Sequence, residues 1–185
     1  MLADLSLIWI TTRAAGVVAL VASSASVILG LALASRVGAG RRRGVLGDVR
    51  VLHQTLGIAT IVALAVHVGT LLLDPWLQPS IIDLAVPLSM DYRPVWTGLG
   101  IVAGYGLLVL TLSGFLRGRA GTRWKAIHRF AGLTWAMSVA HTLGAGTDAG
   151  TTWLQAVTGA CVVPVVVLLA VRLVRSYGIQ IHHTT

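Results

Sequence analysis

Long apolar runs constrain this sequence more than any other feature. Five such runs lie at about residues 9–34, 50–73, 95–116, 125–146 and 153–174. Each reaches the ~20 residues that a helix needs to cross a hydrocarbon core at about 1.5 Å per residue. Only 11% of the 185 residues are charged, whereas soluble domains carry about 25%. The sequence therefore predicts an all-α membrane protein, with residues 1–185 forming a single five-helix transmembrane bundle.

The first run could instead be a secretory signal peptide. It has no basic region at its start, carries Asp4 there, and extends well beyond the apolar core of an ordinary signal peptide. We therefore interpret it as the first membrane helix. The single cysteine, Cys161, lies inside an apolar run, where it cannot form an internal disulfide and is expected to be a packing residue.

Basic residues collect in the connections after the first and third runs and at the end of the fifth. They are Arg36, Arg41, Arg42, Arg43 and Arg50, then Arg117, Arg119, Arg123, Lys125 and Arg129, then Arg172 and Arg175. The opposite connections hold Asp4, Asp74, Asp83, Asp91 and Asp148, with Arg93 as the one basic exception. Positive residues favour the cytoplasmic side, so we expect a multi-pass protein of a bacterial-type inner membrane, with the N-terminus outside and the C-terminus in the cytoplasm. The net charge of +8 thus indicates topology and not a nucleic-acid partner.

The longest connection on the outer side, about residues 74–94, contains Pro75, Trp76, Pro79, Pro87 and Tyr92. Tryptophan and tyrosine suit the boundary between lipid and water. Two interpretations stay open. The segment is either a simple interfacial tether or a cover over the outer end of the bundle that includes a short helix.

Four histidines lie in two of the membrane runs. His53 and His128 lie near the cytoplasmic ends of their helices, and His67 and His141 lie near the outer ends. The separations of 14 and 13 residues correspond to roughly 21 and 20 Å along a helix axis. Two parallel helices thus offer one histidine pair at each of two matching depths. This is the ligand set for two stacked haems, each iron being held by one imidazole from each helix.

A purely hydrogen-bonding or proton-conducting role for the histidines is less favoured. A single histidine in a membrane helix can hydrogen-bond across helices or line a proton path, but four in two depth-matched pairs would repeat that coincidence and its desolvation cost. Zinc needs three or four ligands at one place, whereas these histidines are divided between two depths. The geometry of one helix is also awkward, because a 13-residue spacing leaves His128 and His141 about 140° apart around an ideal helix.

Two glycines follow histidines by four residues, Gly57 after His53 and Gly132 after His128. Each shares a helix face with its histidine, and the missing side chain would leave space for a flat macrocycle. Close helix packing through small residues is the alternative role of these glycines.

The spacings H-x13-H and H-x12-H, the segment WKAIHR at 124–129 and the segment AGTD at 145–148 resemble the ferric reductase-like transmembrane domain family. That family includes NADPH oxidases, ferric reductases and the haem subunit of a bacterial methionine sulfoxide reductase system. The resemblance extends over most of the chain, from about Arg13 to Asp148.

The resemblance implies that His53 and His128 bind a cytoplasmic-side haem b, and that His67 and His141 bind an outer one. Arg13 resembles an arginine of NADPH oxidases and would face a propionate of the outer haem, with snorkelling to the interface as the alternative. NADPH oxidases carry a second histidine four residues after the outer ligand. Here that position is Leu71, so a dedicated superoxide-producing activity is not expected.

We therefore expect a transmembrane electron-transfer protein with two haem b groups. The chain carries no glycine-rich dinucleotide motif, so no flavin or NAD(P) site is expected within it. Electrons would come from a separate cytoplasmic flavoprotein reductase or flavin carrier and pass to an outer-face acceptor. The alternatives are a haem-containing membrane anchor that docks a reductase and, less favoured, a metal-ion or proton transporter.

Overall fold

The computed structural model describes residues 2–34 and 43–181, and within these ranges its regular structure is entirely helical. The helices are α1 (Leu2–Ala34), α2 (Arg43–Leu71), α3 (Ile81–Ala85), α4 (Pro94–Phe115), α5 (Arg117–Ala120), α6 (Arg123–His128), α7 (Ala131–Ala145) and α8 (Thr152–Ile181). Within the described ranges, four helices, α1, α2, α4 and α8, are long and apolar enough to cross a membrane. The all-α class is confirmed, and the structure fits a multi-pass membrane protein.

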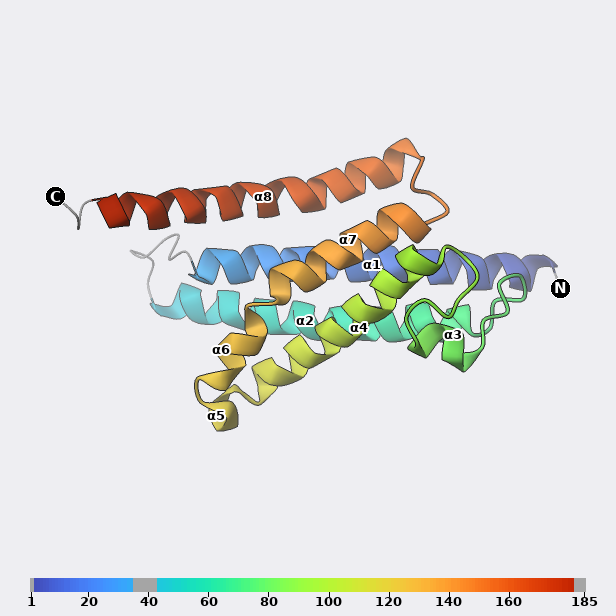
Figure 1. Cartoon of the computed structure of the whole chain (residues 1–185), viewed down its shortest axis with the longest axis horizontal. Helices are drawn as coiled ribbons and strands as arrows, with labels where there is room; N and C mark the ends of the chain where they lie inside the picture. The colour runs from blue at the N-terminus through green and yellow to red at the C-terminus, as the bar shows by residue number, and fades with distance from the viewer. Residues whose placement is uncertain (1, 35–42, 182–185) are drawn as a thin grey trace.

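The long helices run back and forth along one axis (Figure 1). α1 packs against α2, α7 and α8, and α4 packs against α7 and α2, so α1 is the central helix. α8 lies along the outside of the bundle. The start of α1 and the end of α8 lie at opposite ends of the molecule (Figure 1).

Small side chains explain why α1 can occupy the centre. Ala15, Ala19, Ser23 and Ser24 are all buried on it. Because these side chains are short, neighbouring helix backbones can approach closely, which is the usual way that membrane helices pack. The Trp135 indole of α7 fills the space beside Ser24 and donates a hydrogen bond of 2.9 Å to its hydroxyl.

The single helix predicted over 125–146 is wrong. α6 ends at His128 and α7 begins at Ala131, and between them the Phe130 N–H donates to the Ile127 carbonyl at 3.0 Å, three residues back. A turn of this tighter kind rises about 2.0 Å per residue, compared with about 1.5 Å in an α-helix. Three residues in such a turn therefore add about 1.5 Å to the length of the segment, which equals the rise of one α-helical residue. The break therefore compensates for the 13-residue spacing of the two histidines.

The other helix boundaries differ less. α2 begins at Arg43 and α8 continues to Ile181, beyond the predicted 50–73 and 153–174, and α1 begins at Leu2. Apolar runs mark only the part of a helix that can lie in the hydrocarbon core, whereas backbone hydrogen bonding continues into the polar flanks. The predicted basic residues Arg36, Arg41 and Arg42 lie outside the described residues.

The segment over residues 74–94 contains the short helix α3. Ser80 caps it, since its hydroxyl accepts from the Asp83 N–H while the Asp83 carboxylate accepts from the Ser80 hydroxyl and N–H. The donated hydrogen bonds from the hydroxyl and then the backbone of Ser80 lower the pKa of Asp83. Ile81 and Ile82 are exposed on α3, as expected for a helix at a lipid boundary.

Three side-chain hydrogen bonds fasten the same segment to the bundle, one of them from the Tyr92 hydroxyl to the Ala145 carbonyl at 3.1 Å. The Tyr105 hydroxyl of α4 donates to the Ala85 carbonyl at 2.6 Å. The Arg93 guanidinium donates to the Gly144 carbonyl at 2.6 Å, at the C-terminal end of α7, where a positive charge is favourable. Arg93, the exception in the charge pattern, thus binds the end of a helix.

Candidate functional site

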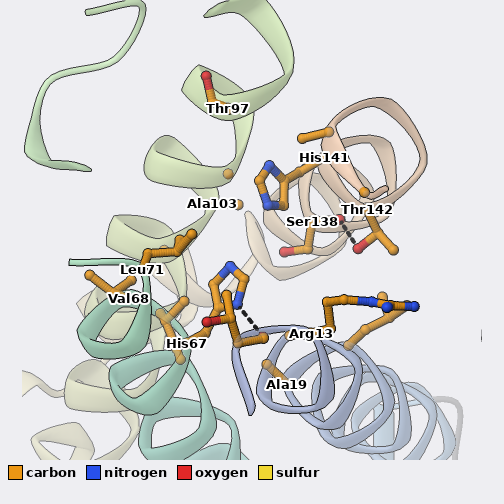
Figure 2. Close-up of a pocket in the computed structure, with 18 of the residues that line it drawn as sticks. Arg13, Ala19, His67, Val68, Leu71, Thr97, Ala103, Ser138, His141 and Thr142 are labelled. Carbon is orange, nitrogen blue, oxygen red and sulfur yellow. Dashed lines mark hydrogen bonds between the residues drawn. The ribbon is translucent and has the colours of Figure 1, made fainter. Parts of the chain in front are cut away.

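The structure brings the four histidines together in two pairs. The ring centroids of His53 and His128, here called the inner pair, are 6.0 Å apart. Those of His67 and His141, the outer pair, are 6.4 Å apart. The two rings of each pair are close to perpendicular, with interplanar angles of 77° and 83°. Figure 2 shows the outer pair, with His67 on α2 and His141 on α7 reaching toward each other.

Backbone carbonyls orient three of these four rings. The Nδ1 atom of His53 lies 2.8 Å from the Ser26 carbonyl, and that of His67 lies 2.8 Å from the Thr12 carbonyl, both on α1. The Nδ1 atom of His141 lies 2.8 Å from the Trp96 carbonyl on α4. A carbonyl only accepts, so Nδ1 carries the proton in each of these rings. The Nε2 atom of each neutral ring is thereby left with a free lone pair, the state that binds metals.

Glycines on the facing helices make these contacts fit. A Cβ atom at Gly16 would lie 3.2 Å from the His67 ring, and one at Gly30 would lie 3.3 Å from the His53 ring. At Gly100 the added atom would lie 2.6 Å from Cε1 of His141, far inside van der Waals contact. None of the three was predicted from the sequence, where the selected glycines were those on the same helix as each histidine.

The two glycines selected from the sequence have other surroundings. A Cβ atom at Gly57 would make an ordinary contact of 3.8 Å with the Thr111 hydroxyl of α4. At Gly132 it would meet nothing within 4 Å. Neither glycine touches a histidine ring, although Gly132 opens onto free space at the start of α7.

His128 differs from the other three histidines. Its Nδ1 atom is buried and has no hydrogen-bond partner. Its ring contacts the Trp124 ring of the same helix, with 5.6 Å between the centroids. A buried polar atom without a hydrogen-bond partner lowers the stability of the fold, so such an atom usually has a structural or functional explanation.

A cavity of about 850 Å³ surrounds the outer pair. α1, α2, α4 and α7 form its walls together with the segment 74–94, the residues that follow α7 and the start of α8. Leu20, Leu64, Ile101 and Leu108 give it a largely apolar lining. Leu71 lies in the same wall as His67, so this wall offers no second imidazole (Figure 2). The volume is within the range of about 300–1,000 Å³ that is typical of cofactor and ligand sites.

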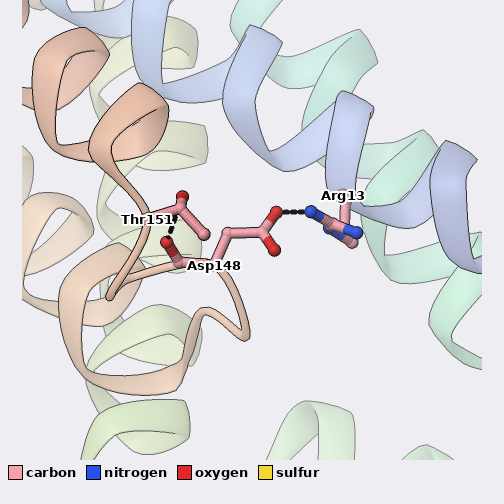
Figure 3. Close-up of polar contacts among 3 residues, drawn as sticks. All are labelled: Arg13, Asp148 and Thr151. Atoms are coloured by element: carbon pink, nitrogen blue, oxygen red, sulfur yellow. Dashed lines mark hydrogen bonds and ion pairs between the residues drawn. The ribbon is translucent and has the colours of Figure 1, made fainter.

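Arg13 forms an ion pair with Asp148 beside this cavity (Figure 3). Its side chain is 28% exposed and that of Asp148 is 15% exposed, and the guanidinium also stacks on the Trp9 ring at 4.0 Å. Asp148, which the sequence placed on the outer side and within the AGTD segment but not beside Arg13, therefore compensates the charge of Arg13 in this structure. Both residues line the cavity.

Among residues 2–34 and 43–181, no three histidine, cysteine or carboxylate side chains converge as a zinc site would require. Comparison of the chain with protein-family models, with curated proteins and with solved structures finds no match. Function must therefore be inferred from the geometry of the histidine pairs and their surroundings.

Proposed function

We propose that this protein is a transmembrane electron-transfer protein that holds two haem b groups, one between the histidines of each pair. The observation that carries the proposal is the separation of the rings. An imidazole nitrogen binds a first-row metal at about 2.0–2.1 Å and lies about 1.1 Å from its ring centre, so rings on opposite sides of one metal have centroids roughly 6.3 Å apart. The observed separations of 6.0 and 6.4 Å agree with this value.

The hydrogen bonds support the same proposal. Metal-binding imidazoles commonly donate their second N–H to a carbonyl, which fixes the ring and makes the ligating nitrogen more basic. Three of the four rings have this arrangement. These Nδ1 bonds also join α2 to α1 and α7 to α4, and they leave Nε2 of each of the three rings free to bind a metal.

Each bound haem would supply a one-electron iron couple, which the surrounding protein tunes. The chain's own residues supply the rest. His53 and His67 on α2 are 14 residues apart, which places the two sites about 21 Å apart along the bundle axis. The largely apolar cavity walls would give a haem at the outer site surroundings of low dielectric constant, and without a C-x-x-C-H motif in the sequence its attachment would be non-covalent.

In the proposed topology the polypeptide crosses the membrane five times, and α6 and α7 together form the fourth crossing. The exposed basic residues at the α5–α6 end would face the cytoplasm; they are Arg117, Arg119, Arg123, Lys125 and Arg129. This surface favours an acidic flavoprotein reductase or an anionic flavin carrier as the donor. An acceptor at the opposite, outer end would meet the carboxylates of that side.

Arg13 lines the cavity of the outer pair, where a haem propionate would compete with Asp148 for its guanidinium. The propionate and the carboxylate carry the same charge, so exchange would keep Arg13 compensated. Leu71 leaves the outer site without the extra imidazole that the oxidases place near oxygen, which supports transfer to an acceptor other than oxygen.

The experiment that tests the proposal is a haem-to-protein ratio on protein purified from cells supplied with haem. We expect two haems per chain and the absorption bands of low-spin b-type haem in both redox states. Protein that binds no haem, or a single haem, under these conditions would refute it. Vesicles with reductant and a cytoplasmic-type flavoprotein on one side and an impermeant acceptor on the other then test electron transfer directly, since a pure anchor would hold haem without passing electrons.

A further inference from the structure

Three of the four histidines are held by the same local device. In each, Nδ1 meets a helix carbonyl, and a glycine four residues further along that helix makes room for the ring. The three devices are Thr12 and Gly16 for His67, Ser26 and Gly30 for His53, and Trp96 and Gly100 for His141. Four residues is one helical turn, so carbonyl and glycine lie on the same face of their helix.

The devices repeat with the spacing of the histidines. On α1, Gly16 and Gly30 are 14 residues apart, as are His67 and His53 on the antiparallel α2. On α4, 14 residues beyond Gly100 lies Gly114, and the residue four before it is Leu110. α4 therefore carries the parts of a fourth device at the depth of His128.

The fourth device is not assembled in the structure. A Cβ atom at Gly114 would meet nothing within 4 Å, and the buried Nδ1 of His128 has no partner. The Leu110 carbonyl accepts instead from the Ser113 hydroxyl, at 2.8 Å. A donor without an acceptor thus lies on α6, which packs against α4, and α4 holds an acceptor with space beside it.

Resting on the proposed function, we propose that Leu110 and Gly114 are positioning residues for His128. When the inner haem is bound, the His128 ring docks on α4, its Nδ1–H donates to the Leu110 carbonyl, and Gly114 gives the ring its space. Within α4 the Leu110 carbonyl also accepts from the Gly114 N–H, and a carbonyl has two lone pairs, so the Ser113 hydroxyl turns away when His128 donates. The turn at Ile127–Phe130 is the joint that allows α6 to make this movement independently of α7.

The test substitutes the glycine and measures the inner haem. Gly114→Val adds a side chain where the structure has open space, so it is harmless unless the ring docks there. Gly159→Val on α8 is the matched control, since its Cβ also meets nothing within 4 Å and α8 carries no histidine of either pair. Gly30→Val is the positive control, because its side chain would press on the ring of His53, the second histidine of the inner pair.

We expect Gly114→Val to raise the midpoint potential of the inner haem or to reduce its occupancy, because an imidazole that loses its Nδ1 hydrogen bond becomes a weaker donor to iron. Gly30→Val should act in the same direction. The outer haem and the Gly159→Val protein should match the parent. An inner-haem potential and occupancy in Gly114→Val equal to those of Gly159→Val would overturn the inference.

A second measurement covers the case in which Gly114→Val does not accumulate. An experimental structure of the haem-loaded parent protein should place His128 Nδ1 within hydrogen-bonding distance of the Leu110 carbonyl. Two bound haems with His128 Nδ1 donating elsewhere would refute this inference and leave the proposed function standing. Protein that binds no haem would refute both this inference and the proposed function.

Discussion

Replacing Gly100 by alanine should selectively weaken haem binding at the outer of the two proposed sites. The added Cβ atom would lie 2.6 Å from Cε1 and 2.7 Å from Cγ of His141. Nδ1 is the ring atom nearest to the added Cβ, so the ring would have to retreat by roughly 1 Å to reach ordinary contact. This movement would stretch its 2.8 Å hydrogen bond to the Trp96 carbonyl beyond the hydrogen-bonding range. Losing an outer-shell partner of this kind typically costs about 10–100-fold in metal affinity.

The assay is a titration of haem-free protein with haem, followed at the absorption bands of the two sites. Gly100→Ala should bind the inner haem with the parent affinity and the outer haem about 10–100-fold more weakly. Gly16→Ala, whose Cβ would lie 3.2 Å from the His67 ring, should have a smaller effect on the same site. Gly159→Ala serves as the control. Equal affinity of Gly100→Ala and Gly159→Ala for the outer haem would show that the carbonyl and glycine contact does not position the ligand.

Three further outcomes are expected. His67→Ala should empty mainly the outer haem site and His53→Ala mainly the inner one, as judged by redox titration of each variant; loss of the same haem in both would disprove the pairing. Asp148→Asn should destabilise the haem-free protein by about 1–3 kcal/mol in thermal unfolding, because Arg13 loses its charged partner. The destabilisation should be smaller when haem is bound, since a propionate would then pair with Arg13. An equal destabilisation in both states would show that Arg13 does not contact the haem. The nearly perpendicular rings should give strongly anisotropic low-spin EPR signals for the oxidised haems, whereas signals typical of parallel imidazole planes would contradict the observed angles.

The depth matching of the histidines could be predicted from sequence, because helical rise alone converts spacing into distance along the axis. The break between His128 and Ala131 could not, since hydropathy is averaged over a window longer than a single turn. The awkward 13-residue spacing was the one sign that the helix over 125–146 could not be straight. Its position depended on local hydrogen bonds that the sequence does not specify.

The residues that position the rings were not predicted from the sequence, for a different reason. Gly16, Gly30 and Gly100 act across a helix interface, so their importance appears only when the neighbouring helix is known. The 14-residue interval between Gly16 and Gly30, equal to that between the histidines of α2, was visible in the sequence and could have indicated them. The pairing of Arg13 with Asp148 joins residues 135 positions apart and needed the fold.

The central position of α1 also bears on how the protein is made. α1 alone supplies the carbonyls for both histidines of α2, so the first two helices contain everything needed to orient His53 and His67. Because a chain emerges from its N-terminus, this hairpin can form before α4 and α7 are synthesised. At that stage each of the two histidine pairs has one oriented imidazole, and the later helices supply the second. The order of synthesis thereby separates ligand orientation from site closure, and any haem that arrives early would find only one of its two ligands.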